Sequence, residues 1–203
     1  MNHEQNPAFQ KVNVPKLRKE TKKLSDKEIK ERIDIIKNSV LFGQYTTEEI
    51  QNSMVRVAFD FDGTLSETYF DGTVNKSSDE IRNFFVELQN RGVRVCVMTR
   101  RYGHEYNEGK ENEHQTVFEF AEKFGLDKND VHFTDREYKV NTLHDLGVHL
   151  LIDDDPEECY GVRKRFSIYN AVCVDSNHNN GVLWRRGAEA MIRFFIQIYV
   201  DKS

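Results

Sequence analysis

The chain beyond residue 54 alternates between two patterns of apolar side chains. Short, nearly continuous apolar runs are typical of buried strands, and we expect strands at 54–60, 93–99, 131–134, 148–153 and 169–174. Between these runs apolar residues recur at helical spacing, which predicts helices at 78–91, 114–125, 137–146, 156–166 and 185–200. Strands that alternate with helices in this way favour an α/β fold, a Rossmann-like parallel sheet with helices on both faces.

The N-terminal part of the chain has a different character. Residues 1–23 carry basic side chains among few apolar ones, which favours a flexible arm that is either a solvated tail or a contact for an anionic partner. A capping-box pattern begins at Ser25, and isoleucines at helical spacing then predict a helix to about Asn38. A further helix is expected from Thr46. The predicted organisation is a basic arm over 1–23, a helical extension over 24–53 and an α/β domain over 54–203.

Two carboxylates follow the first apolar run. Asp60 stands at its end, and Asp62 lies in a turn where Gly63 lets the backbone bend without a clash from a β-carbon. One interpretation is an ordinary capped turn. However, a buried strand rarely ends in two carboxylates unless something holds them there. The spacing therefore indicates a phosphoryl-transfer site, with Asp60 as nucleophile or metal ligand and Asp62 as general acid and base.

The line Asp60-Phe61-Asp62-Gly63-Thr64-Leu65 resembles the first signature of the haloacid dehalogenase-like (HAD) superfamily, mostly magnesium-dependent phosphatases. The resemblance implies that Asp60 attacks phosphorus and forms an aspartyl-phosphate, which Asp62 helps to form and then to hydrolyse. Gly63 and Thr64 would contact the substrate. The segment 54–203 would then be an HAD-like catalytic domain.

Two later segments resemble further HAD motifs. The β-rich run that ends at Thr99 is similar to the second motif, whose hydroxyl binds the phosphoryl group. The run that ends in Asp153-Asp154-Asp155 is similar to the fourth motif, whose carboxylates hold magnesium, and successive acids would repel one another without a cation. The magnesium ligands that the resemblance implies are Asp60, Asp62 through its carbonyl, and Asp153 or Asp154.

The third HAD motif supplies a basic residue that neutralises the phosphoryl oxygens and the nucleophile. Lys139 is the predicted residue, because it opens the helix expected just before the Asp153 strand and can reach the carboxyl edge of the sheet. Lys123 and Lys128 are competing candidates nearby.

The loop that follows Thr99 begins with Arg100 and Arg101 and is long and polar. Arginine suits a second phosphate or a nucleic-acid backbone, so we expect both residues to bind substrate. The alternative is a mobile surface loop. An arginine after the second motif, with paired acids in the fourth, is also similar to the phosphatase domain of polynucleotide kinase-phosphatases.

The gaps at which many HAD members insert a cap domain are short in this chain, so the resemblance implies a capless, open site. The expected substrate is a nucleotide or a nucleic-acid phosphate end. One alternative is a sugar phosphate or other small metabolite, with the N-terminal helices or a second subunit as a lid. The N-terminal helices are expected either to pack on the domain or to form the contact of a homo-oligomer. Another alternative is an HAD-fold binding protein without turnover.

Composition narrows the class of protein. The chain has 203 residues and is 38% hydrophobic, which is sufficient for a core of its own. A net charge of -5 argues against a protein that coats nucleic acid generally. The three cysteines show neither a disulfide nor a zinc spacing, and no apolar run reaches membrane-spanning length, so a cytoplasmic protein is expected.

Overall fold

The computed structural model describes residues 45–68, 72, 74, 78–103, 113–174 and 181–200. The expected basic arm over 1–23 and the helix expected from Ser25 to Asn38 lie outside these residues, as does most of the loop that follows Arg101. The predicted boundaries between arm, extension and α/β domain therefore stay predictions.

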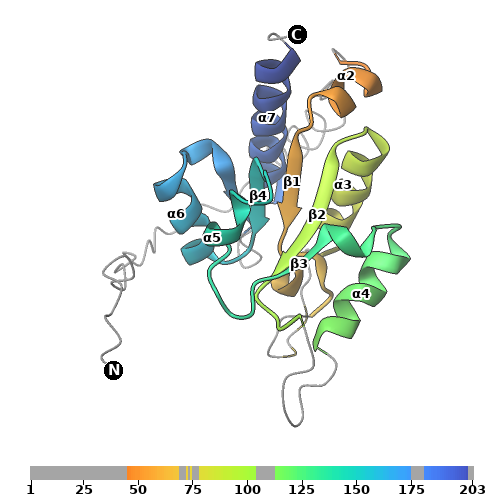
Figure 1. Ribbon diagram of the computed structural model, residues 1–203, viewed down its shortest axis with the longest axis vertical. Coiled ribbons are helices and arrows are strands. Elements are labelled where there is room, and N and C mark those ends of the chain that lie inside the picture. The colour runs from red at the N-terminus through yellow and green to blue at the C-terminus, as the bar shows by residue number, and fades with distance from the viewer. Residues whose placement is uncertain are drawn as a thin grey trace, which may run out of the picture.

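A parallel sheet forms the centre of the molecule (Figure 1). Its five strands lie in the order β3-β2-β1-β4-β5, and every neighbouring pair is parallel. The strands are β1 (Arg56–Phe59), β2 (Arg94–Thr99), β3 (Val131–Phe133), β4 (Leu150–Asp153) and β5 (Ala171–Cys173). Each lies within the range predicted for it, and the predicted α/β class with a parallel sheet is confirmed.

Helices cover both faces of the sheet. Successive side chains of each strand point to opposite sides, and because both sides are apolar, each forms a core with the helices packed on it. Val57 and Phe59 of β1 belong to one core, with side chains from the helices α2 (Thr47–Asn52), α3 (Ser78–Asn90), α4 (Glu113–Lys123) and α7 (Gly181–Val200). Ala58 belongs to the other core, with side chains from α5 (Val140–Leu143) and α6 (Pro156–Arg165). Short helical turns complete the described elements: η2 (Phe61–Leu65), η3 (Lys128–Asp130) and η4 (Ile168–Asn170).

Two helices differ from the sequence-based expectation. The prediction of a helix over 137–146 is wrong in its length, because α5 covers only Val140–Leu143. Turns continue from there to Gly147, whose φ is +62°. The hydrogen bond from Gly147 N–H to the His144 carbonyl has the tighter spacing of a 3₁₀ turn. Helix α7 begins at Gly181 rather than at residue 185, because Trp184 is buried against the ring of Phe84 and holds the first turn.

The helix expected from Thr46 is confirmed as α2, whose first turn is closed by a reciprocal capping box between Thr46 and Glu49. Among the described helices, none combines the length and the apolar character needed to cross a membrane.

Candidate active site

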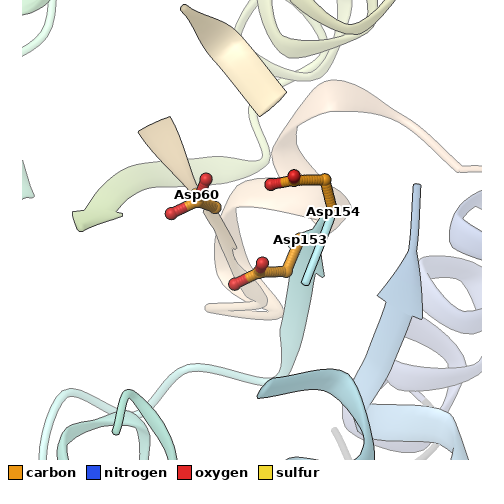
Figure 2. Close-up of side chains that lie close together, drawn as sticks. All are labelled: Asp60, Asp153 and Asp154. Atoms are coloured by element: carbon orange, nitrogen blue, oxygen red, sulfur yellow. The ribbon is translucent and has the colours of Figure 1, made fainter. Parts of the chain in front are cut away.

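Three carboxylates gather at the carboxyl edge of the sheet. Asp60 follows β1, Asp153 ends β4, and Asp154 comes directly after it. Because β1 and β4 are neighbours in a parallel sheet, their carboxyl ends lie side by side. One carboxylate oxygen from each residue lies within 4.8 Å of the others, and Figure 2 shows the side chains directed into one shared space.

The turn after Asp60 brings the chain back over this space. Asp62 (φ −75°, ψ 124°) and Gly63 (φ 78°, ψ −10°) have the angles of the two central residues of a type II turn. That turn requires a positive φ at its third position, so the predicted role of Gly63 in bending the backbone agrees with the structure. Thr64 is buried, and its hydroxyl lies 3.2 Å from Oδ1 of Asp154.

Lys139 lies between two of the acids. It precedes the first turn of α5 and is only 2% exposed. Its Nζ lies 2.6 Å from Oδ1 of Asp60 and 2.7 Å from Oδ2 of Asp153. The competing candidates lie elsewhere, with the Lys123 ammonium over the Phe124 ring and the Lys128 ammonium over the Phe118 ring. The structure therefore brings Lys139 to the carboxylates.

Burial controls the protonation of this cluster. It raises the pKa of Asp60 well above its usual value; the charge of Lys139 opposes the rise, and the charges of Asp153 and Asp154 add to it. Burial and the charge of Asp153 raise the pKa of Asp154 to about 6. For Lys139 burial lowers the pKa, but the charges of Asp60 and Asp153 outweigh it, and the pKa rises above its usual value. One ammonium thus contacts two of the three clustered carboxylates, and a bound cation would relieve the mutual repulsion that contributes to the raised pKa values.

Asp62 lies outside the three-carboxylate cluster and contacts Arg101. The Nε and Nη2 atoms of Arg101 lie 2.9 and 2.6 Å from the two carboxylate oxygens of Asp62, a bidentate ion pair. Nη1 of the same guanidinium donates to the Glu113 carbonyl at 2.8 Å, and the group stacks on the ring of Phe61. The Thr99 hydroxyl is 3.5 Å from Oδ2 of Asp62. Arg101 is thus engaged with a residue of the proposed reaction, which the sequence did not indicate.

Arg100 turns toward the other side of the site. Its guanidinium lies over the ring of Tyr138, with 5.0 Å from Cζ to the ring centroid. Its Nη2 donates to the Arg136 carbonyl at 3.0 Å, and its Nε is 3.6 Å from Oε1 of the buried Glu158. Sequence reasoning missed Glu158. The available signal was its position four residues before Val162, which places it on the buried face of α6.

No family model matches the chain, and no curated protein matches it. Any reaction assigned to the site depends on the residues and geometry described above.

Proposed function

We propose that the protein is a magnesium-dependent phosphomonoesterase that acts through an aspartyl-phosphate on Asp60. One observation carries the proposal: Asp60 lies at the carboxyl edge of a parallel sheet beside two further carboxylates and a buried lysine that touches it. A nucleophilic carboxylate, a cation site and a fixed positive charge are the parts that phosphoryl transfer to an aspartate needs.

The residues present fit a hard divalent cation. Asp60, Asp153 and Asp154 offer oxygen atoms only, within 4.8 Å of one another, and oxygen ligands suit Mg²⁺. When bound, the ion would neutralise charge on the carboxylates and on the phosphate of the substrate. Lys139 leaves part of the negative charge uncompensated, which supports the assignment of a metal to this cluster.

The chain's own residues account for both chemical steps. An oxygen of Asp60 attacks phosphorus, the bond to the leaving oxygen breaks, and Asp62 gives its proton to that oxygen. Lys139 and the Thr99 hydroxyl stabilise the charged phosphoryl oxygens. Water then attacks the phospho-aspartate and passes a proton to Asp62, and the bond between phosphorus and Asp60 breaks to release phosphate.

The ion pair with Arg101 bears on the role of Asp62. Both carboxylate oxygens of Asp62 accept from the guanidinium, so Arg101 fixes the orientation of the group that exchanges protons in both steps. Proton transfer to the leaving oxygen requires that the Asp62 carboxyl group face the substrate, so we expect its contact with Arg101 to loosen when substrate binds. The substrate phosphate is itself a suitable partner for the guanidinium that is released.

A nucleotide or a nucleic-acid phosphate end is the proposed substrate class. Two contacts between arginine and tyrosine flank the site: Arg100 over Tyr138, and Arg136 over Tyr102. Guanidinium groups bind phosphate and tyrosine rings stack on bases, so together they suit a nucleotide. A capless site would leave this surface open to a large substrate. A sugar phosphate would use the catalytic residues without these contacts.

Phosphate release measured over nucleotides, sugar phosphates and oligonucleotides phosphorylated at either end tests the proposal. We expect turnover that requires Mg²⁺ and that Asp60→Asn abolishes, because an amide cannot act as the nucleophile although its shape is nearly the same. Asp145→Asn is the matched control, because that carboxylate is 80% exposed. Substantial turnover by Asp60→Asn would rule out the mechanism. A folded wild-type protein that hydrolyses no ester would favour a binding protein.

A further inference from the structure

A buried carboxylate next to the site has no part in the reaction described above. Glu158 lies in the first turn of α6 and is only 1% exposed. Its Oε2 accepts the backbone N–H of Lys139 at 3.1 Å, and its Oε1 faces Nε of Arg100 at 3.6 Å. Within the described part of the chain, neither Oε1 of Glu158 nor Nε of Arg100 has a hydrogen-bond partner, although both atoms are buried.

A buried carboxylate oxygen without a partner is unfavourable, and so is a buried guanidinium N–H. The two atoms face each other at slightly more than hydrogen-bond length. A small shift of the Arg100 side chain would satisfy both. The pair is therefore a contact that a small rotation of the Arg100 side chain can tighten into a hydrogen bond.

Arg100 spans the distance between this buried carboxylate and the solvent. Its side chain is 38% exposed, while the Tyr138 ring and the Arg136 carbonyl fix the orientation of the guanidinium. Residue 100 also follows directly on Thr99, at the edge of the sheet where Asp60 lies. The guanidinium thus has one side against Glu158 and another available to a ligand at the site.

We propose that Glu158 is a positioning residue. It orders Arg100 to receive a second anionic group of the substrate, and it holds the Arg100 guanidinium at a fixed position relative to Lys139. This inference rests on the proposed function and narrows its substrate class to phosphate esters that carry a second negative group, such as a nucleoside with two phosphates. Helices α5 and α6 contact each other on one face of the sheet (Figure 1), so one side chain of α6 reaches both basic residues.

Ordering of the Arg100 side chain before substrate binds gives the buried Glu158 carboxylate a role. An arginine side chain loses much rotamer freedom when it binds an anion, and a residue that orders it beforehand lowers that cost. Burial raises the pKa of Glu158 to about 7, although the charge of Lys139 opposes the rise; Asp153 adds to it and Arg100 counters it. The carboxylate is thus held at an electrostatic cost, as expected of a group with a role beyond packing.

The test compares Glu158→Gln, Arg100→Gln and the double variant with the wild-type protein. Glutamine keeps the size of the side chain and an oxygen that can accept the Lys139 N–H, but loses the charge that faces Arg100. Glu157→Gln is the matched control, since it makes the same change one position earlier in α6, on an exposed side chain. The substrates are adenosine 3′,5′-bisphosphate, which has a second anionic group, and p-nitrophenyl phosphate, which has none.

We expect Glu158→Gln to lower the ratio of kcat/KM for the bisphosphate over the generic ester at least roughly tenfold, mainly through KM. In the Arg100→Gln background the same change should have no further effect on that ratio, and Glu157→Gln should match the wild type. An equal loss on both substrates would overturn the proposal, because Glu158 would then act through Lys139 alone. An unchanged ratio, or the same loss without Arg100, would also overturn it.

Failure of the proposed function is separable from failure of this inference. If the wild-type protein hydrolyses neither ester, the phosphatase proposal is wrong, and dissociation constants from calorimetry then decide the role of Glu158. Weaker binding of the bisphosphate relative to adenosine 5′-monophosphate in Glu158→Gln supports that role. A wild-type protein that binds the bisphosphate no better than the monophosphate overturns it.

Discussion

At the scale of single residues, one ammonium group pairs with two of the buried carboxylates of the site. Lys139 contacts Asp60 and Asp153 through one ammonium group. Because all three side chains are buried, loss of the ammonium would leave two buried carboxylates unpaired, which is costly. The same pairing orients Asp60, since Lys139 contacts Oδ1 and leaves the other carboxylate oxygen for the proposed attack on phosphorus.

Arg100 and Arg101 are adjacent in the sequence but should behave differently when mutated. Arg101→Ala should lower turnover of every phosphate ester by roughly tenfold to a hundredfold, because it removes charged hydrogen bonds from Asp62. Arg94→Ala, at an exposed position at the start of β2, is the control. Initial rates on p-nitrophenyl phosphate and on a nucleotide measure the effect. A loss confined to the nucleotide would instead make Arg101 a substrate-binding residue, as the sequence alone suggested.

Glu158 should make the stability of the protein depend on pH. Its pKa is raised to about 7 in the folded protein from an ordinary value of 4.5, so the folded state binds a proton more tightly than the unfolded state. The free energy of unfolding should therefore fall as pH rises through this window, by up to about 3 kcal/mol from this group. Glu158→Gln lacks the titration, so its stability relative to wild type should rise over the same window. Urea denaturation at several pH values, with Glu157→Gln as control, measures the difference. A difference that does not vary with pH would contradict the raised pKa.

At the scale of elements, the strands and the acids at their ends were predictable, because buried parallel strands are continuous apolar runs and their last residues stand out. Asp60, Thr99 and Asp153 could be placed at one edge for that reason. The partners of Arg100 and Arg101 could not, because they lie on other elements and depend on packing. The length of α5 could not be predicted from the sequence either, because the spacing of apolar residues does not distinguish an α-helix from a run of tighter turns.

The turn after β1 gives a prediction at this scale. Gly63→Ala should destabilise the protein by about 1–2 kcal/mol, because φ at this position is +78° and a β-carbon is strained there. Turnover should also fall, since the turn carries Asp62. Gly161→Ala is the control, because that glycine lies inside α6 with open space around its missing β-carbon, and alanine there should be neutral or stabilising. Equal stability changes in the two variants would show that the turn tolerates a β-carbon.

At the scale of the whole molecule, the cation site should link metal concentration to folding. Mg²⁺ at roughly a hundred times its dissociation constant should raise the free energy of unfolding by about 2.7 kcal/mol, because only the folded chain brings the three carboxylates together. Asp154→Asn removes one carboxylate and should show a smaller increase. Thermal unfolding with Mg²⁺ and with a chelator measures both. An equal increase in the two proteins would place the bound ion at another site.

The order of the strands along the chain also determines at what stage of synthesis and folding the site can form. The carboxylates come from β1 and β4, and the Thr64 to Asp154 contact joins residues that are 90 positions apart. β2 and β3 lie between them in the sequence, and β1 pairs with β4 only after the chain has made those crossovers. A nascent chain that has not yet extended past Asp154 has Asp60, the proposed nucleophile, without the other two carboxylates of the cluster. Such distant contacts form late, after the entropy of closing a long loop has been overcome. Metal affinity would therefore report that β1 has paired with β4, and a chain stalled before β4 would lack the cation site.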